Sequence, residues 1–431
     1  MDKNSFAKTP PMGWNSWDCY GAAVNEEQLL GNAEYMAKNL KQFGWQYVVC
    51  DIQWYEPKAK DNDYNNFTEL CMDEYSRLIP AENRFPSSKN GAGFKPISDK
   101  IHSMGLKFGI HIMRGIPRQA VHRNTKILGT DKTAREIAHH FSVCSWNTDM
   151  YGIEADRKGA QEYYDSIFEL YASWGVDFVK VDDICVTEFR KWDNPYSARA
   201  EVEMIRKAID KTGRPIVLSL SPGPAEISVA EHLCENANMW RLTGDFWDDW
   251  TQLRSMFDRC KMWENVVAKG KWPDCDMLPL GRISKNGTCH GEKNRYTNFT
   301  HDEQITLMTL WCIFRSPLMF GGEMRENDEW TLNLITNSEV LAVNQDSHGG
   351  KEIFRDDSTV IRKAYDNKNN VIFAVFNISD EKNTVVVDFN KFGFETEKTL
   401  RDLWKRDDIC KTENIMNFEV APHGAVLYKI Y

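Results

Sequence analysis

Short apolar runs alternate with longer amphipathic segments from about residue 10 to residue 320. The short runs are typical of buried parallel strands, and the longer segments repeat their apolar positions with the period of a helix. Eight strands are expected here, namely Met12–Ser16, Gln46–Ile52, Lys107–Met113, Val176–Ile184, Ile216–Ser221, Met239–Asp245, Met277–Leu280 and Pro317–Phe320. Eight such strands, each followed by a helix, close into a (β/α)8 TIM barrel.

The amphipathic segments supply the helices of an outer ring. Helical periodicity covers Glu26–Phe43, Ile97–Met104, Ala160–Trp174, Tyr196–Lys211, Trp247–Trp263 and Asp302–Ile313. Two further stretches, Tyr55–Gly93 and Arg114–Gly159, leave the ends of expected strands and are too long for ordinary βα loops. Because βα loops form the mouth of a barrel, we expect both insertions to shape a substrate site.

The pattern changes after Gly349. Short β-branched or aromatic runs, separated by Asp, Asn, Lys and Gly turns, predict strands at Thr359–Tyr365, Val371–Asn377, Thr384–Phe389 and Gly424–Tyr431. We therefore expect a barrel that carries the active site over residues 1–345 and a C-terminal antiparallel β-sandwich domain over residues 346–431.

Charge and composition exclude several classes of partner. The net charge of -10 and the absence of any Lys/Arg block argue against nucleic acid as a partner. No stretch approaches the roughly 18 apolar residues that span a membrane, and the first residues lack the apolar core of a secretory signal. We expect a cytoplasmic protein with no membrane partner. The sequence does not fix the oligomeric state, and a homo-oligomer stays open.

Cysteine and histidine patterns give no sign of a bound metal. Eleven cysteines are scattered singly, without a C-x-x-C pair or a Cys/His cluster of zinc spacing. His139 and His140 lie in a segment expected to be helical, where one of the two faces solvent. Neither a Walker sequence nor a glycine-rich dinucleotide motif is present. The sequence therefore predicts neither a metal nor a nucleotide cofactor.

Candidate chemistry lies at the carboxyl ends of two expected strands. In the first, strand alternation puts Lys180 and Asp182 on one face and Asp183 on the other. An ammonium group beside Asp182 favours the ionised carboxylate that a nucleophile requires. The alternative for Asp182 is an ordinary strand-end acid that caps the following helix, a role that Asp183 fits better.

The second acid is Asp245, which follows a glycine and lies four positions after Arg241. An acid that donates a proton near neutral pH needs a raised pKa, which a neighbouring carboxylate and aromatic walls can provide. The alternative is that Asp245, Asp248 and Asp249 form the acidic first turn of a helix beginning at Trp247. The strand-end position favours Asp245 for chemistry and the other two for the cap.

Two convergent carboxylates are what cleavage of a glycosidic bond requires, so sugar hydrolysis is the leading hypothesis. Sugar recognition also needs several donors and acceptors aimed at fixed hydroxyls. Further polar residues stand at expected strand ends: Asp51, His111, Ser221 and Asp276. Three tryptophans near early strand ends offer flat faces on which a sugar can stack: Trp14, Trp17 and Trp54.

At these positions the chain resembles glycoside hydrolase family 27, the family of α-galactosidases and α-N-acetylgalactosaminidases. The matching motifs follow in order along the barrel: Thr9-Pro-Pro-Met-Gly-Trp-Asn-Ser-Trp17, Val49-Cys-Asp-Ile-Gln-Trp54, Lys107-Phe-Gly-Ile110, Lys180-Val-Asp182, Trp240-Arg-Leu-Thr-Gly-Asp245, Trp272-Pro-Asp-Cys-Asp-Met277, Arg315-Ser-Pro-Leu318 and Val343-Asn-Gln-Asp346. The family's fold, a (β/α)8 barrel followed by an antiparallel β domain, agrees with the pattern described above.

The resemblance implies a glycoside hydrolase that works by a retaining double displacement, with Asp182 as the nucleophile and Asp245 as the acid/base. It also implies sugar contacts from Trp14, Asp51, Lys180, Arg241 and Asp276. The expected partner is an oligosaccharide or glycoside substrate, and no metal or organic cofactor is required.

Three departures from the family's usual pattern bear on the substrate. Ile52 replaces the second of two adjacent acids that bind the 4- and 6-hydroxyls of galactose, and an aliphatic group cannot accept those hydrogen bonds. His111 stands where the family often has a tyrosine. Ser221 begins a run of small residues where α-galactosidases place a Glu near the 2-hydroxyl. This run resembles that of α-N-acetylgalactosaminidases, where it makes room for a 2-acetamido group.

Three functions stay open on this resemblance. The first is an exo-glycosidase that removes terminal α-linked galactose or N-acetylgalactosamine. The second is a β-L-arabinopyranosidase, because arabinopyranose is galactose without its hydroxymethyl group and Ile52 fills the vacated space. The third is a non-catalytic sugar-binding barrel. The resemblance also places Cys144 and Cys185 near the family's active-site disulfide, although Cys185 lies one residue beyond the usual place, and the bridge stays open.

Overall fold

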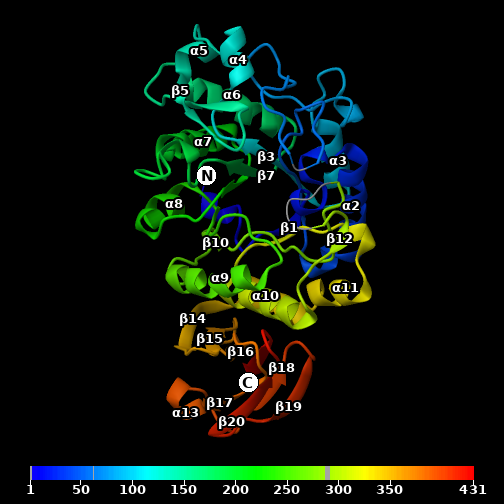
Figure 1. Ribbon diagram of the computed structural model, residues 1–431, viewed down its shortest axis with the longest axis vertical. Coiled ribbons are helices and arrows are strands. Elements are labelled where there is room, and N and C mark those ends of the chain that lie inside the picture. The colour runs from blue at the N-terminus through cyan, green and yellow to red at the C-terminus, as the bar shows by residue number, and fades with distance from the viewer. Residues whose placement is uncertain (1, 62, 287–291) are drawn as a thin grey trace.

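The computed structural model describes residues 2–61, 63–286 and 292–431. A barrel domain occupies the middle of the molecule, the second insertion covers its upper end, and a β domain lies below it (Figure 1). Both predicted parts of the fold, the TIM barrel and the C-terminal antiparallel sandwich, are confirmed. Within the described ranges, no helix combines the length and the apolar character needed to cross a membrane.

Eight parallel strands form the barrel wall. In spatial order they are β10 (Trp272–Asp274), β9 (Met239–Arg241), β8 (Val217–Leu220), β7 (Phe178–Asp182), β3 (Lys107–Met113), β2 (Tyr47–Cys50), β1 (Met12–Asn15) and β13 (Leu318–Phe320). The two outer strands of this order meet through Leu278. Its backbone pairs in parallel with Phe320, and its N–H donates to the Met319 carbonyl at 2.8 Å. The ring is therefore closed.

The seventh strand differs from the expected one. The prediction placed it at Met277–Leu280, whereas the ladder with β9 is formed by Trp272–Asp274. A proline lacks the N–H donor and is disfavoured inside a central strand, so Pro273 hid this strand in the sequence. Here Pro273 pairs only with β9, and the predicted segment contributes the closing contact of Leu278 instead.

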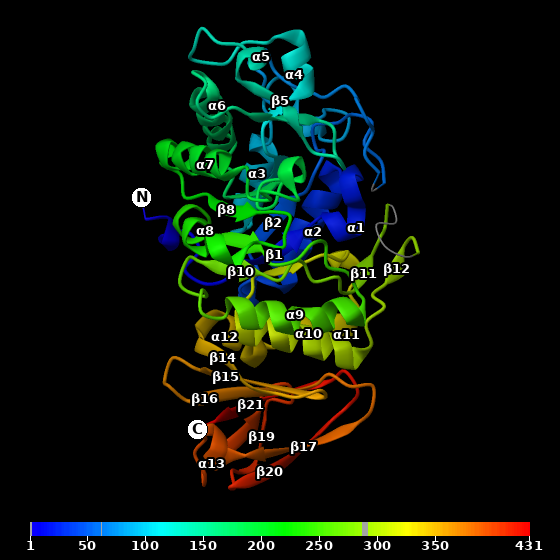
Figure 2. The same ribbon diagram turned by 60° about the vertical axis from the view of Figure 1, so that its left-hand side comes forward.

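Helices surround the barrel as an outer ring (Figures 1 and 2). They are α1 (Trp17–Tyr20), α2 (Glu26–Asn39), α3 (Lys95–Ser103), α6 (Ala160–Ser173), α7 (Arg199–Thr212), α8 (Ala230–Asn236), α9 (Trp250–Trp263), α10 (His301–Phe314), α11 (Glu329–Ile335) and α12 (Ser338–Asp346). Capping boxes of Asn25 with Gln28 and of Thr300 with Glu303 satisfy the first N–H groups of α2 and α10. All six predicted helices are present, with ends shifted by a few residues.

The two insertions build a cap beside the barrel mouth. The first contains only the short 3-10 helix η4 (Pro86–Ser88) as regular structure among its described residues. The second holds α4 (Arg118–Arg123), α5 (Ala134–Ile137) and a sheet of β4 (Ile116–Pro117), β6 (Met150–Ile153) and β5 (Ala138–Val143). The prediction of a helix around His139 and His140 is wrong, because both residues lie in strand β5. The chain leaves α5 after one turn and pairs with β6, leaving His140 exposed.

The C-terminal domain consists of two antiparallel sheets. The larger has the order β14 (His348–Arg355), β15 (Thr359–Tyr365), β16 (Val371–Asn377), β21 (Ala425–Ile430), β18 (Thr399–Asp402) and β19 (Asp407–Lys411), and the smaller pairs β17 (Asn383–Asp388) with β20 (Ile415–Val420). Aromatic residues such as Phe373, Phe389 and Phe418 fill the space between the sheets. Beside them lies the one-turn helix α13 (Phe389–Phe392).

A layer of helices joins the two domains, with α9, α10, α11 and α12 between the barrel and β14–β16 (Figure 2). Nearly every residue of α10 is buried, as expected for a helix covered on all sides. Trp404 and His423 of the β domain form hydrogen bonds with Thr309 and Thr306 of this helix. The exact boundary between residues 345 and 346 stays a prediction; α12 ends at Asp346 and β14 begins at His348.

Candidate active site

A cavity of about 370 Å³ opens at the carboxyl ends of the barrel strands. Its volume is in the range of small-molecule sites. The structure brings six of the nine predicted site residues together in its wall: Asp51, Lys180, Asp182, Arg241, Asp245 and Asp276. This is the face on which barrel enzymes carry their chemistry.

Asp182, the predicted nucleophile, is the last residue of β7. Its Oδ2 lies 3.0 Å from His111 Nε2, and its Oδ1 accepts the Asp183 N–H at 2.9 Å. Burial alone would raise the pKa of Asp182, but the hydrogen bond and charge of His111 and the charge of Lys180 outweigh it and hold this pKa well below its usual value. The low pKa favours the ionised carboxylate, and Asp182 lines the cavity.

Lys180 and Asp51 form a buried ion pair beside it. Strand alternation puts Lys180 on the same face of β7 as Asp182, and its Nζ donates to Asp51 Oδ2 at 3.1 Å. Asn15 donates to the same oxygen at 2.7 Å. Burial alone would lower the pKa of Lys180, but the charges of Asp51 and Asp182 raise it above its usual value. The pair thus keeps both charges.

Asp245 stands at the mouth of the cavity, in the loop after β9 rather than on the strand as expected. Its side chain is 67% exposed and accepts from Arg241 Nη2 at 3.1 Å. The same nitrogen lies 2.8 Å from Asp276 Oδ2 and donates to the Gly244 carbonyl. One guanidinium therefore connects Asp245 with the buried Asp276.

The roles of the neighbouring acids in this loop also follow from the structure. The helix begins at Trp250, and Asp249 caps it by accepting the Gln252 N–H at 3.1 Å, which confirms the predicted cap. Asp248 does not cap it. Arg295 and the backbone of Asn298 bind the Asp248 carboxylate instead.

Asp276 is held from several sides. Its Oδ2 accepts the Phe246 N–H at 2.8 Å, and its own N–H donates to Asp274 Oδ1 at 2.9 Å. Burial raises the pKa of Asp276, although Arg241 opposes the change. Burial and the adjacent Asp276 raise the pKa of Asp274 to about 7. Asp276 in the cavity wall and Asp274 behind it thus take up protons more readily than Asp182 does.

Three predicted site residues do not line the cavity. His111 and Ser221 lie directly behind it, where they contact Asp182 and Arg241. Trp14 is fully buried and donates its indole N–H to the Gly322 carbonyl at 2.7 Å. Trp14 is therefore not exposed to the cavity, where a sugar could contact it.

An aromatic wall lines the cavity instead; of its three rings the sequence singled out Trp17 but not Tyr64 or Trp146. Trp17 stacks on Tyr64 with ring centroids 6.0 Å apart and an interplanar angle of 17°, and Tyr64 packs against Trp146 at 5.6 Å. All three rings line the cavity. Tyr64 and Trp146 come from the two insertions, so the expectation that these insertions shape the mouth is met at two named positions.

Asp18 is another lining residue that the sequence did not single out. Its side chain is buried, with 3% of the residue exposed, and its Oδ2 has no hydrogen-bond partner in the described part of the chain. Burial and the nearby Asp276 raise its pKa well above the usual value. Asp18 therefore takes up a proton more readily than an exposed aspartic acid does. It follows the motif that carries Trp14 and Trp17, but no strand end marks it.

A second layer holds the residue after Asp182 in place. Asp183 has a positive φ of 50°, and Arg114 binds both its carbonyl at 2.5 Å and its carboxylate at 2.9 Å. Glu201 in turn binds Arg114 at 3.1 Å and accepts the Tyr164 hydroxyl at 2.5 Å. This network fixes the turn on which the N–H donor to Asp182 depends.

Among residues 2–61, 63–286 and 292–431, no group of three or more His, Cys, Asp or Glu is arranged to hold a metal ion. Cys144 and Cys185 are both buried free thiols. The disulfide left open by the sequence is thus not formed here.

Two family models match the chain. The model for alpha galactosidase A matches residues 149–346, and the model for the alpha galactosidase C-terminal beta sandwich domain matches residues 358–430. An alpha-galactosidase from Cyamopsis tetragonoloba is 28% identical over 436 residues, covering 99% of this chain and 87% of that protein.

Two solved bacterial structures are much more similar. A GH27 β-L-arabinopyranosidase from Geobacillus stearothermophilus is 56% identical, with a TM-score of 0.97 over 100% of this chain and 98% of that one. A protein from Bacillus halodurans, provisionally assigned as an α-N-acetylgalactosaminidase, is 52% identical, with a TM-score of 0.88 over 98% and 97% of the two chains.

Proposed function

The chain belongs to glycoside hydrolase family 27 and is a glycosidase, and we propose that it removes terminal β-L-arabinopyranose with retention of configuration. The observation that carries this choice of sugar is Ile52, whose side chain lines the cavity beside Asp51. A galactoside would bring its hydroxymethyl group to a position where family members often offer a carboxylate, and Ile52 offers only an aliphatic surface.

The comparison with arabinopyranose follows from the shape of the sugars. β-L-Arabinopyranose has the ring hydroxyls of α-galactose but no hydroxymethyl group. An isoleucine can fill that vacated space and gain from apolar contact with the ring, whereas it would leave a buried hydroxyl without a partner. The 56% identity to a β-L-arabinopyranosidase supports the same choice.

In the proposed mechanism, Asp182 attacks the anomeric carbon and Asp245 protonates the departing glycosidic oxygen. The low pKa of Asp182 supports this role, because a nucleophile must be ionised. Asp245 then removes a proton from water, which releases the sugar from Asp182. Its exposed position supports contact with the aglycone oxygen and with incoming water.

The remaining polar groups of the wall would bind the sugar hydroxyls. Lys180 and Asp51 form one donor and acceptor pair, and Arg241 with Asp276 forms another. Each pair is already oriented by its neighbours, which reduces the entropy lost on binding. The aromatic wall of Trp17, Tyr64 and Trp146 offers apolar surface to a sugar face or an aglycone.

A panel of nitrophenyl glycosides tests the sugar. We expect kcat/KM for β-L-arabinopyranoside to exceed that for α-galactoside, and Ile52→Asp to shift the preference toward galactoside by at least about tenfold. Ile52→Val is the matched control, since it keeps an aliphatic surface. Galactoside hydrolysis faster than arabinopyranoside hydrolysis in the parent protein would overturn the choice of sugar.

A second candidate is α-N-acetylgalactosaminide. Pro222 and Gly223 line the cavity, and such small groups leave room for a 2-acetamido substituent. The 52% identity to the Bacillus halodurans protein supports this candidate. The nitrophenyl α-N-acetylgalactosaminide in the same panel decides between the two. The non-catalytic alternative is set aside, because the relatives are glycosidases and both proposed acids line the cavity.

A further inference from the structure

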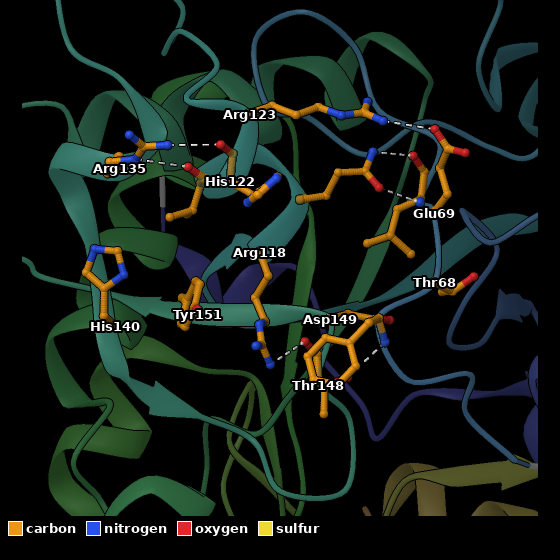
Figure 3. A pocket seen from close by; sticks show the side chains of 14 residues that line it. Thr68, Glu69, Arg118, His122, Arg123, Arg135, His140, Thr148, Asp149 and Tyr151 are labelled. Carbon is orange, nitrogen blue, oxygen red and sulfur yellow. Dashed lines mark hydrogen bonds and ion pairs between the residues drawn. The ribbon is translucent and has the colours of Figure 1, made fainter.

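A second cavity, of about 660 Å³, lies on the two insertions and shares no lining residue with the active-site cavity. Residues 67–70 form one wall, and the regions of α4, α5, β5 and β6 form the others. Figure 3 shows Arg118 in its middle, with Arg135 and His140 on one side and the pair of Arg123 with Glu69 on the other.

Positive side chains gather here although the protein as a whole is acidic. Between residues 114 and 159 the chain has eight Lys or Arg, five Asp or Glu and three His residues, against a net charge of -10 for the whole sequence. Five of the basic side chains line the cavity: Arg118, His122, Arg123, Arg135 and His140. Concave basic surfaces concentrate anions.

Two aromatic rings hold the side chain of Arg118 in place, but its positive charge has no described negative partner. Its guanidinium carbon lies 4.7 Å from the centre of the Phe67 ring and 5.0 Å from that of Tyr151. Within the described ranges its side chain donates one hydrogen bond, from Nη1 to the Thr148 carbonyl at 3.3 Å, and no described carboxylate pairs with it. A guanidinium held between two rings keeps further N–H donors in a fixed plane, which suits a planar carboxylate.

Arg135 provides a second cation of this kind. Its Nε and Nη2 donate to the carbonyls of Val121 and His122, at the end of α4, and it has no carboxylate partner in the part of the chain that the structure describes. Arg123 differs, because Glu69 pairs with it at 2.9 Å. Arg118 and Arg135 are therefore the two charges available to an anionic ligand.

The cavity also lies close to the active site along the chain. Tyr64 and Trp146 line the active-site cavity, whereas Phe67 and Thr148 line this one. Consecutive Cα atoms are about 3.8 Å apart, so these neighbours lie within about 11 Å and 8 Å of each other. The same two chain segments thus connect both cavities.

We propose that this second cavity is a glycan-binding site for acidic, uronic-acid-containing sugar chains. Arg118 and Arg135 would bind carboxylates of the glycan, and the exposed ring of Phe67 would pack on a sugar face. This proposal rests on the proposed function in one respect: because the protein is a glycosidase, we take the ligand that carries the carboxylates to be a glycan. It deepens that function by naming a class of natural substrate.

Binding of trigalacturonate to the full chain, measured by calorimetry, tests the proposal. Its methyl ester is the matched neutral ligand. We expect the acid to bind at least about tenfold more tightly than the ester, and Arg118→Gln and Arg135→Gln each to weaken binding of the acid about tenfold. Arg157→Gln is the control variant, because it removes the same charge from the same insertion outside this cavity.

Equal affinity for acid and ester would overturn the proposal, as would an equal loss in Arg157→Gln, which would indicate general surface charge. Displacement of trigalacturonate by saturating L-arabinose would place its binding in the active site instead and would also overturn it. Displacement by inorganic phosphate at the same concentration of negative charge would show that the cavity binds simple anions without recognising a glycan, and would also overturn the proposal. These measurements need no turnover, so their failure is distinguishable from failure of the proposed hydrolysis.

Discussion

At the scale of single residues, Asp182 differs from an ordinary strand-end acid in its neighbours. His111, Lys180 and the N–H of Asp183 stabilise its charge. Asp182→Ala should therefore lower kcat by about ten-thousandfold, and azide should restore part of the rate as a glycosyl azide of inverted configuration. The product is identified by NMR. Hydrolysis within about tenfold of the parent rate without azide would mean that another residue is the nucleophile.

Asp245 is expected to act by protonating the leaving group. Asp245→Asn should reduce hydrolysis of methyl arabinopyranoside far more than that of the nitrophenyl glycoside, because only the first leaving group needs the proton. We expect the ratio of the two losses to reach about a hundredfold. Steady-state kinetics on both substrates measures it, and equal losses would contradict the acid role.

Asp18 is predicted to make stability depend on pH. Burial and Asp276 raise its folded pKa against the opposing charge of Lys180, so the native state binds this proton more tightly than the unfolded chain does. Stability is therefore lost as pH rises from the unfolded pKa of about 4 toward the folded one. Asp18→Asn should raise Tm by roughly 1–3 °C at pH 8, and the gain should shrink toward pH 4.

Thermal melts across this pH range provide the measurement for Asp18. Asp357→Asn, in an exposed turn, is the control and should show no such trend. A variant that is less stable than the parent at every pH would show that Asp18 is held as a carboxylate.

The sequence revealed residues at strand ends better than residues on insertions. Asp51, Lys180 and Asp182 could be found because alternation and strand polarity determine where their side chains point. Tyr64 and Trp146 could not, since their positions depend on how two irregular segments fold over the barrel. The burial of Trp14 also depends on packing with distant residues near Gly322.

At the scale of elements, the loop that carries Asp245 ends in the cap of α9. Asp249→Ala removes the acceptor for the Gln252 N–H and should lower the free energy of unfolding by about 1 kcal/mol. Asp249→Ser keeps a capping oxygen and should restore most of it. Urea denaturation of the two variants measures the difference, and equal stability of Asp249→Ala and Asp249→Ser would contradict a capping role.

Elements with strong periodicity were predicted well, and those with mixed signals were not. The bounds of β15 and β16 match the predicted strands, because both are rich in β-branched and aromatic residues and lie between clear turns. β14, β18, β19 and β20 were not predicted, since charged residues interrupt their apolar pattern. β10 was missed because of Pro273.

At the scale of the whole molecule, a buried ion pair connects the barrel to the β domain. Arg362 of β15 is fully buried and lies 3.0 Å from Glu264 at the end of α9. Arg362→Met leaves this buried carboxylate with only the longer ion pair to Lys261 at 3.4 Å, so we expect a loss of about 3 kcal/mol in the free energy of unfolding. Chemical denaturation measures it. Lys382→Met, which breaks an exposed pair with Glu419, should change stability by less than about 1 kcal/mol.

The way the barrel ring closes has a consequence for the sugar site. Seven of the eight junctions between strands are regular ladders, whereas the eighth depends on the two backbone hydrogen bonds of Leu278. Asp276 lies only two residues before Leu278. The guanidinium of Arg241 connects Asp276 to Asp245. The wall on the Asp276 side therefore has fewer inter-strand hydrogen bonds at its junction than the wall that carries Asp182, so the contacts of Asp276 with Arg241 and with the Phe246 N–H are needed to hold that side of the proposed sugar site in place.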